Sequence, residues 1–377
     1  MLEMLGPVHR IDRGKLSILA ESNEKATEAR VGGKTCPSPI FSQAFGSGYS
    51  KGRGTGRTSP CVIVHRRRVC DFSQLSSFPS SRIWNSMGTV IDSHFLAFTA
   101  LITIGYQFLF FVVTALLKFD KVTDFAGSTN FIIIGVLTLV IKGSWYFRQI
   151  ILTLFVGIWG LRLGLFLLFR ILQWGEDRRF DEMRNNLGRL AIFWIFQAVW
   201  VWAVSLPVTV VNASDRNPFL QAVDIVGWIL WCVGFIVEGT ADQQKLNFKR
   251  SSENRGRWCN VGLWKYSRHP NYFGEILLWW GIFVASTPVL KGAEWLVIIG
   301  PIFLTLLLLF VSGIPMLEDS ADKKFGNVDG YRTYKSRTSP LIPLPRSIYG
   351  NLPAWFKRSF LLEFPFYSRN LPQQENW

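Results

Sequence analysis

The sequence is short of charge, cysteine and histidine, and each shortage excludes a class of protein. Charged residues make up 18% of the chain, below the roughly 25% that soluble domains carry. The five cysteines are scattered, which argues against a disulfide framework, and none of them forms a zinc-like pair. With four histidines, no His-Glu-x-x-His string and no nucleophile elbow, metal and serine-hydrolase chemistry are disfavoured. We predict no metal site.

Long apolar stretches take the place of the missing charge. A helix needs about 20 apolar residues to cross the roughly 30 Å hydrocarbon layer. Five stretches are close to that length: residues 94–117, 190–211, 222–240, 273–290 and 294–317. Residues 131–169 are too long for one span and are interrupted by polar residues near 142–149, so we predict two spans there. The sequence therefore predicts an all-α, polytopic membrane helix bundle of about seven transmembrane helices, with six as the alternative.

Residues 1–86 differ from everything that follows. They are rich in Gly, Ser and Arg, and no apolar run in them is long enough for a core or a signal peptide. We predict a disordered basic extension and leave three interpretations open: a targeting arm, a basic surface tether, or a mispredicted start with Met87 as the working initiator. The rest divides into N-terminal transmembrane helices, residues 87–240, and a C-terminal region, residues 241–377, with two spans and a tail.

The basic loops indicate which face of the membrane is cytosolic. Lys and Arg concentrate in residues 170–189, in residues 241–272 and in the tail after residue 317, whereas residues 212–221 hold one Arg and one Asp. Cytoplasmic loops accumulate Lys and Arg, so we predict that the first three segments face the cytosol. The net charge of +15 is spread over short loops, which favours anionic lipid or an anionic cofactor over nucleic acid as the partner.

Residues 263–275, Leu-Trp-Lys-Tyr-Ser-Arg-His-Pro-Asn-Tyr-Phe-Gly-Glu, hold the densest run of side chains that can carry chemistry. The run lies where a basic loop re-enters the membrane. Its cations, imidazole, amide and phenols could clamp the phosphates and ribose of a nucleotide. Basic and aromatic residues at a helix end also suit a simple interfacial anchor, and composition alone leaves both interpretations open.

Two further charged positions lie where charge is expensive. Arg162 falls inside an apolar stretch, so it either faces the bundle interior as a functional residue or pairs with Glu238 or Asp242. Glu318 and Asp319 directly follow the last apolar stretch. An acid pair there needs cations or water.

We expect Lys245, Arg268 or His269 to supply those cations, with a solvated helix end as the alternative. Tyr331 and Tyr334 follow in the tail. Because they are three residues apart, they share a face if the tail is helical.

The string at 263–275 resembles the C-terminal signature of the steroid 5-alpha-reductase superfamily. From about Met87 to the tail, the chain is similar to the plant and bacterial branch known as DUF1295, including residues 174–180 and 241–245. A second family, the isoprenylcysteine carboxyl methyltransferases, uses a similar string to bind S-adenosylmethionine. Asn271 and the preceding Leu263-Trp264 favour the reductases.

The resemblance implies a cytosol-facing pocket for NADPH, and the preference for NADPH over NADH rests on analogy alone. The cofactor-binding residues implied are Lys245, Lys249, Leu263, Trp264, Arg268, His269, Asn271, Tyr272, Glu318, Asp319, Tyr331 and Tyr334. In steroid reductases the pair that polarises the substrate carbonyl comes from the N-terminal half, and that pair does not map onto this chain. Tyr146 and Glu176 stand as the candidate catalytic residues.

The function implied is reduction of a carbon–carbon double bond in a steroid, sterol or other lipid-like substrate by a membrane-bound, NADPH-dependent enzyme. The endoplasmic reticulum is the expected location, with a plastid as the alternative. Membrane lipids and a lipid-like substrate are the expected partners, and the oligomeric state is not indicated. Two alternatives stay open: an S-adenosylmethionine-dependent methyltransferase acting on a lipidated substrate, and a non-catalytic lipid-binding protein.

Overall fold

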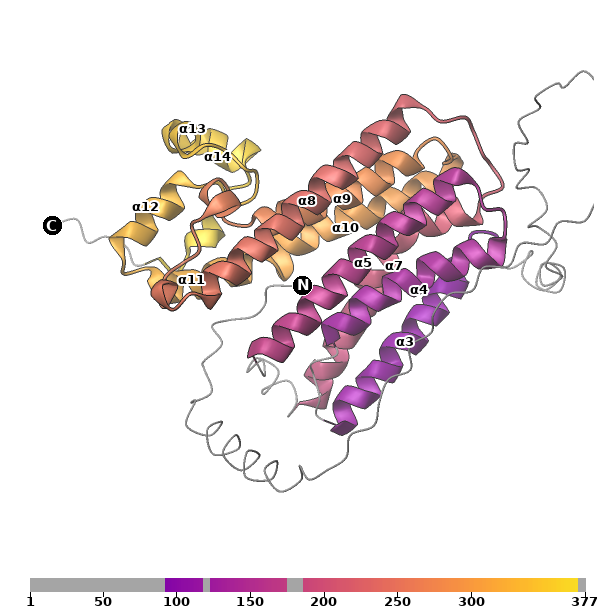
Figure 1. Ribbon diagram of the computed structural model, residues 1–377, viewed down its shortest axis with the longest axis horizontal. Helices are drawn as coiled ribbons and strands as arrows, with labels where there is room; N and C mark the ends of the chain where they lie inside the picture. Colours follow the sequence, from indigo (N-terminus) through magenta and orange to yellow (C-terminus); the bar gives the residue numbers. More distant parts are fainter. Residues whose placement is uncertain (1–91, 118–122, 175–185, 372–377) are drawn as a thin grey trace, which may run out of the picture. The chain divides into compact units, whose positions relative to one another are not determined.

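Every named secondary-structure element in the described part of the chain is helical (Figure 1). The computed structural model describes residues 92–117, 123–174 and 186–371. The predicted basic extension, residues 1–86, and Glu176 lie outside the described residues. The long helices are α3 (Leu96–Leu117), α4 (Thr123–Lys142), α5 (Phe147–Trp174), α7 (Leu187–Ala213), α8 (Ala222–Arg250) and α9 (Pro270–Ser286).

The predicted multi-pass membrane bundle is confirmed. Among the described residues, six helical stretches are long and apolar enough to cross a membrane, the last of them covering Gly292–Phe325. The span predicted at residues 273–290 forms α9, whose 17 residues lie at the short end of spanning lengths. The protein is therefore an integral, multi-pass membrane protein, as the apolar stretches indicate.

The predicted break in the long apolar stretch lies between α4 and α5. The chain leaves α4 through Gly143, whose φ of 67° is in the left-handed region that glycine adopts without steric cost. The side chain of Gln149 then accepts hydrogen bonds from the backbone N–H of Tyr146, at 3.0 Å, and from the hydroxyl of Ser144, at 2.8 Å. These contacts fix the start of α5, and the prediction of two spans here is confirmed.

The last apolar stretch is helical but irregular. It consists of η4 (Gly292–Ile298), α10 (Ile299–Leu306), the π-helical turn η5 (Leu307–Val311) and α11 (Ile314–Phe325). At the junction before α11, a Cβ on Gly313 would lie 2.5 Å from the carbonyl oxygen of Leu308, so only glycine fits. Such π-turns often occur at functional sites, and this one precedes the helix that carries Glu318.

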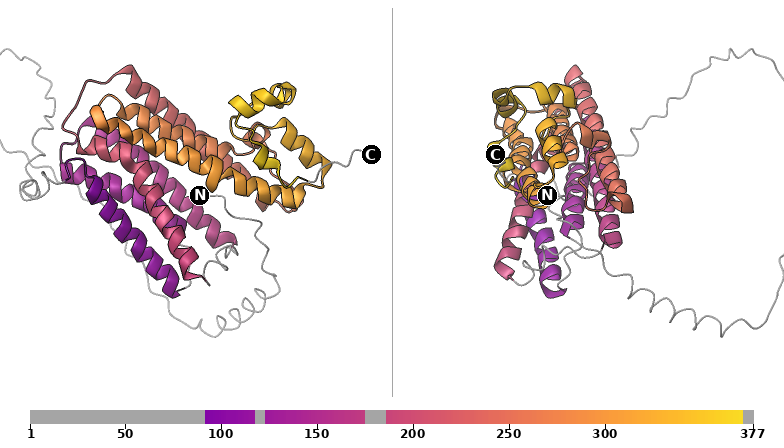
Figure 2. Two further views of the ribbon diagram at one scale, coloured as in Figure 1. Left: turned by 180° about the vertical axis from the view of Figure 1, so that it is seen from behind. Right: turned by 90° about the vertical axis from the view of Figure 1, so that its left-hand side faces the viewer.

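Helices α8 and α9 lie closer together than side chains normally permit. A Cβ on Gly234 would come within 2.6 Å of the carbonyl oxygen of Gly274, and one on Gly281 within 2.7 Å of that of Gly227. Small residues at matching positions let membrane helices approach at backbone distance. The two helices run side by side in both views of Figure 2, and this contact brings Glu238 of α8 against the backbone of Gly274.

Aromatic rings fill the centre of the bundle. The ring of Phe131 lies 5.3 Å from Trp159, 4.9 Å from Trp200 and 5.2 Å from Trp279, measured between centroids. Edge-to-face pairs of this kind stabilise a core beyond their buried area. Trp200 and Trp279 are buried and pack between helices.

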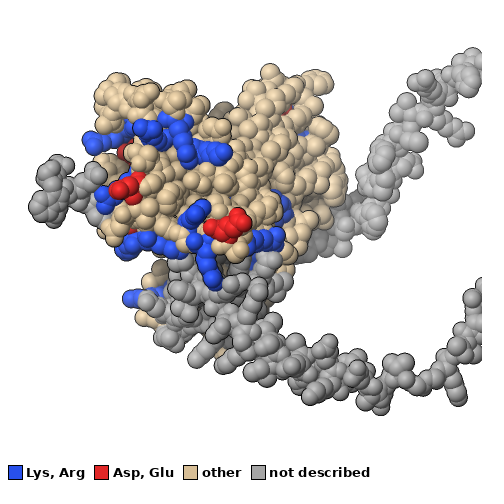
Figure 3. Space-filling model, turned by 60° about the vertical axis from the view of Figure 1, so that its left-hand side comes forward, with Lys and Arg blue, Asp and Glu red and all other residues tan. Residues whose placement is uncertain are grey.

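The tail folds back onto the loop that precedes α9. It comprises α12 (Asp329–Arg337), α13 (Arg346–Asn351), α14 (Ala354–Phe360) and η6 (Pro365–Ser368), which lie beyond the ends of α8 and α10 (Figure 1). Ser267 and Ser339 form an isolated parallel β-bridge, and the Arg268 N–H donates to the Ser339 carbonyl at 2.8 Å. Lys and Arg side chains gather on the face that carries the tail (Figure 3).

Candidate functional site

The residues predicted to bind a cofactor surround the first turn of α9. His269 is the N-cap and Pro270 occupies the first turn, where its missing N–H and fixed φ favour helix initiation. The Ser267 hydroxyl donates to the Leu341 carbonyl at 2.8 Å. Arg268 and His269 thereby contact residues of the tail and of α11, whereas Asn271 and Tyr272 are buried on α9 itself.

Six charged or titratable side chains form what we term the tail charge cluster: Arg268, His269, Glu318, Asp322, Lys335 and Glu363. The Glu318 carboxylate is its centre. Its Oε1 lies 2.8 Å from His269 Nε2 and 3.3 Å from Arg268 Nε, and its Oε2 lies 2.8 Å from Lys335 Nζ. Arg268 and His269 belong to the re-entry segment, residues 263–275, and both contact Glu318 at the acidic start of the tail. The prediction that these two residues supply cations to Glu318 is therefore confirmed.

The other two carboxylates complete the pairing of the cluster's cations. Arg268 binds Glu363 through Nη2, at 2.7 and 2.9 Å from the two carboxylate oxygens. Lys335 Nζ lies 2.6 and 2.7 Å from the two oxygens of Asp322. Burial disfavours the charged guanidinium, but Glu318 and Glu363 outweigh that effect and raise the pKa of Arg268. Arg268 is thus a permanent cation with two carboxylate partners.

Two tyrosine hydroxyls also donate hydrogen bonds to carboxylates of the tail charge cluster. Tyr331 donates to Asp322 at 2.8 Å and Tyr349 donates to Glu363. Burial and the nearby carboxylates raise the pKa of both phenols above the ordinary range, so both remain protonated donors. Tyr331 and Tyr334 both pack against the ring of Trp258, which fits the predicted shared face.

A second group of charges lies inside the bundle, and we term it the inner acid cluster: Arg162, Glu238, Asp242 and Glu275. Arg162 donates to Asp242 at 2.8 Å and to Glu238, and Trp159 donates to Glu238 at 3.1 Å. The structural ion pairs predicted for Arg162 are therefore present. Glu275 of α9 is fully buried and close enough to interact electrostatically with Glu238 and Asp242. Among the described residues, these three carboxylates face the guanidinium of Arg162.

Two buried side-chain oxygen atoms on α9 accept no hydrogen bond from the described residues. They are Oδ1 of Asn271, a residue 3% exposed, and Oε1 of Glu275, a residue 1% exposed. Because the two residues are four apart on α9, their side chains share one helix face. A buried acceptor without a donor is costly, and this pair therefore suits a ligand that carries N–H groups or positive charge.

Other predicted cofactor residues make structural contacts. Lys245 Nζ lies 4.2 Å from the centroid of the Trp264 ring, and Trp264 Nε1 donates to the Ala241 carbonyl at 2.9 Å. The Leu263 N–H donates to the side chain of Gln244 at 2.8 Å. Lys249 is exposed in the last turn of α8. These contacts attach the re-entry loop to the end of α8.

Asp319, Tyr334 and Tyr146 are placed differently from Glu318. Asp319 points away from the cluster and pairs with Lys323 at 2.8 Å, because consecutive helix residues are about 100° apart. The Tyr334 hydroxyl donates to the Trp264 carbonyl at 2.9 Å. Tyr146 precedes α5 at the opposite end of the bundle, near Asp224 in the first turn of α8. That end is about 30 Å along α8 from the re-entry loop, so the structure does not bring Tyr146 to the site.

Sequence reasoning missed Asp322, Lys335, Tyr349 and Glu363 as site residues. Asp322 follows Glu318 by four residues, and that spacing on a helix puts both carboxylates on one face. The spacing was the available signal. No local pattern marks Glu363, which is 95 residues from Arg268 in the chain.

Comparison with known proteins connects this geometry to a family and to a relative. Residues 110–338 match the family described as "Protein of unknown function (DUF1295)". Methanethiol S-methyltransferase 1 of Bradyrhizobium diazoefficiens is 31% identical over 170 residues, which is 43% of this chain and 53% of the relative. The chain thus spans about half the length of this curated relative. No solved structure matches.

These findings correct the predicted activity and cofactor. The relative is named as an S-methyltransferase, so the prediction of an NADPH-dependent reductase, and with it NADPH as cofactor, is wrong. The structure supplies a physical reason, because Arg268 and Lys335 are already paired with buried carboxylates and do not offer unmatched charge to the phosphates of a dinucleotide. The methyltransferase alternative agrees better with the relative. Since the family match covers more than half of its length, the chain belongs to the DUF1295 family.

Proposed function

We propose that this chain is a membrane-embedded methyltransferase that uses S-adenosylmethionine and takes a small thiol as its acceptor. The observation that carries the proposal is the 31% identity to a methanethiol S-methyltransferase over 170 residues. The same string of residues, from Arg268 to Tyr272, resembles the one that isoprenylcysteine carboxyl methyltransferases use for S-adenosylmethionine. The acceptor class comes from the relative's name.

The inner acid cluster fits this ligand in charge. S-adenosylmethionine carries a cationic sulfonium, a cationic amino group and a carboxylate, so it is a net cation, and a bundle interior stabilises such a cation only through matching carboxylates. Glu238, Asp242 and Glu275 outnumber Arg162 there. Oδ1 of Asn271, which lacks a donor among the described residues, suits an amino group of the ligand.

Each residue then has a definite task. Asn271 accepts a hydrogen bond from the ligand, Glu275 adds negative charge opposite the positive charge of the ligand, and Arg162 holds Glu238 and Asp242 in fixed orientations. The buried aromatic rings around Trp159 exclude water, which strengthens every electrostatic contact. When bound, S-adenosylmethionine supplies a methyl group activated by its positive sulfur.

A thiol acceptor must lose its proton, because the thiolate is the nucleophile. Oε1 of Glu275 is the chain's atom that we assign to hold this proton. Its burial and its lack of a hydrogen-bond donor among the described residues support that assignment.

The test uses the full chain purified in detergent. We expect S-adenosylmethionine to raise its unfolding temperature, since a ligand that binds only the folded state stabilises it. With methanethiol as the acceptor, gas chromatography should detect dimethyl sulfide. Neither stabilisation by S-adenosylmethionine nor a methylated product would refute the proposal.

Two variants and two matched controls locate the site. Asn271→Ala and Glu275→Gln should each weaken S-adenosylmethionine binding by about tenfold or more, because each removes a buried contact to a charged or polar ligand group. Asn351→Ala and Glu253→Gln change the same residue types at exposed positions and should leave affinity unchanged. Equal affinity in all four variants would place the ligand elsewhere.

A further inference from the structure

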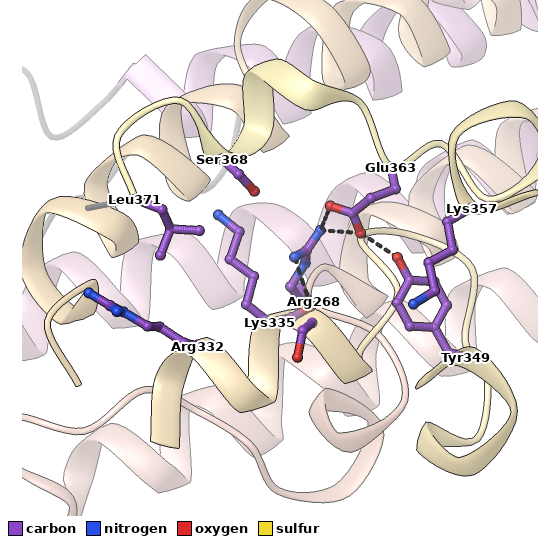
Figure 4. A pocket seen from close by; sticks show the side chains of 9 residues that line it. Arg268, Arg332, Lys335, Tyr349, Lys357, Glu363, Ser368 and Leu371 are labelled. Carbon is purple, nitrogen blue, oxygen red and sulfur yellow. Dashed lines mark hydrogen bonds and ion pairs between the residues drawn. The ribbon is translucent and has the colours of Figure 1, made fainter. Parts of the chain in front are cut away.

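The tail contains a pocket that is separate from the inner acid cluster. It has a volume of about 410 Å³ and is lined mainly by polar and charged side chains (Figure 4). The lining residues are Arg268, Arg332, Lys335, Ser336, Tyr349, Lys357, Glu363, Ser368 and Leu371. Pockets that bind small molecules commonly measure about 300–1,000 Å³, so this one can hold more than a single ion.

The pocket carries positive charge that no carboxylate in the described part of the chain neutralises. Arg268 and Lys335 are paired within the tail charge cluster, and Glu363 is held by Arg268 and Tyr349. Arg332 and Lys357 contact only uncharged groups in the described ranges. Arg332 Nε donates to the Gly326 carbonyl at 2.6 Å, and Lys357 Nζ lies 4.7 Å from the centroid of the Tyr349 ring.

Most of the pocket lies outside the region shared with the family. The family match ends at residue 338, and Tyr349, Lys357, Glu363, Ser368 and Leu371 come after it. The pocket is therefore formed by this chain's C-terminal segment together with four residues of the family region, Arg268, Arg332, Lys335 and Ser336. The activity inferred from the relative does not account for it.

We propose that this pocket binds a phosphate-bearing ligand, with Arg332 and Lys357 as the cations at its two ends (Figure 4). The guanidinium of Arg332 presents several N–H donors in a planar arrangement that matches phosphate oxygens, and Lys357 adds a point charge. The hydroxyl of Ser336 lies at the rim and is exposed. A phosphate ester accounts for both the charge and the volume.

Two sources carry this chemistry: the headgroup of an anionic membrane lipid and a soluble phosphate ester. Trp355 and Phe360, which flank Lys357 on α14, are 64% and 59% exposed. Aromatic residues beside cations are typical of the membrane–water interface, so the test includes a lipid arm.

The soluble arm measures the unfolding temperature of the full chain in detergent with inorganic phosphate and with glycerol 3-phosphate. The lipid arm compares nanodiscs of phosphatidylcholine with and without phosphatidic acid. Stabilisation in the first arm identifies a soluble ester as sufficient, and stabilisation in the second arm alone identifies a lipid headgroup. Both results support the site, and no stabilisation in either arm overturns it.

Charge-matched variants tie the effect to the pocket. The double variant Arg332→Gln/Lys357→Gln should weaken phosphate binding by about tenfold or more, because it removes two charge-assisted contacts. Lys324→Gln/Arg358→Gln loses the same charge at exposed positions outside the pocket and should bind as the unaltered chain does.

A third variant keeps the test decisive if the first double variant is unstable. Ser336→Glu adds a carboxylate at the exposed rim and should weaken binding through repulsion. Equal binding by the Ser336→Glu variant and the unaltered chain, or by the two double variants, would overturn the proposal.

Discussion

Nη2 of Arg268 contacts both carboxylate oxygens of Glu363, at 2.7 and 2.9 Å, although the two residues are 95 apart in the chain. Arg268 belongs to the re-entry segment and Glu363 to the last part of the tail. Because the guanidinium is nearly inaccessible to water, the pair depends on correct docking of the tail. Substitution of Arg268 therefore tests whether docking of the tail stabilises the protein.

Arg268→Gln should lower the free energy of unfolding by about 3–5 kcal/mol, because it leaves the Glu318 and Glu363 carboxylates without their shared cation. Arg268→Lys should cost less, since it keeps the charge and loses only the further guanidinium contacts to Glu318 and to the Lys335 carbonyl. Unfolding in mixed micelles, followed by tryptophan fluorescence, measures both. A change below about 1 kcal/mol for Arg268→Gln, the size expected of exposed pairs, would mean that the cluster contributes little to stability.

The close approach of α8 and α9 gives a second prediction. Gly234→Ala should destabilise the protein by about 1–3 kcal/mol, because the added methyl group would overlap backbone atoms of α9. It should also weaken S-adenosylmethionine binding by separating Glu238 from Glu275. Gly105→Ala is the control, since nothing lies within 4 Å of a Cβ at that position. If the control destabilises as much as Gly234→Ala, helix separation is not the cause.

The pairing of Arg162 with Glu238 predicts coupling between the two residues. Arg162→Gln should be strongly destabilising on its own, because it leaves buried carboxylates unmatched. Combining it with Glu238→Gln should recover part of the loss, with a coupling energy of about 1–3 kcal/mol. A double-mutant cycle of unfolding free energies tests this. Strict additivity would show that the two side chains do not interact.

Tyr146 provides a prediction of no effect on the reaction. Because it lies at the end of the bundle away from Arg268, Tyr146→Phe should leave both S-adenosylmethionine affinity and the rate of methyl transfer unchanged. Asp224→Asn at the same end should reduce stability by about 3–5 kcal/mol, since Asp224 is fully buried and paired with Arg148, yet leave affinity unchanged in the folded protein. A lower methyl-transfer rate in the Tyr146→Phe variant would return this residue to the site.

Much of the fold follows from the sequence because span length and interruption are local properties. The apolar stretches predict the helices, and the polar residues near 142–149 predict the break between α4 and α5. The pairing of Arg162 was also predictable, since a buried cation needs an anion and Glu238 lies in a neighbouring span. The π-turn before α11 was not, because it depends on how Gly313 packs against Leu308.

The identity of the ligand could not be predicted from the motif alone. The string from Arg268 to Tyr272 suits several nucleotides, and the selection depends on charges that three helices contribute. Arg162 comes from α5, Glu238 and Asp242 from α8, and Glu275 from α9. The resemblance to the reductases led to NADPH, and only the folded tail shows that both Glu318 and Glu363 pair with Arg268.

The packing of the tail against the re-entry segment also determines when the tail charge cluster can form during biosynthesis. Ser267 is hydrogen-bonded to a residue 74 positions later, and Arg268 pairs with Glu363, which is 95 positions later. Because chains fold from the N-terminus as they are made, the early helices can insert and pack while the Arg268 charge has no carboxylate partner. Synthesis of residue 363 is therefore needed to complete the tail charge cluster, and a ribosome that stops short of it releases a membrane protein with its spans in place and this cluster unfinished.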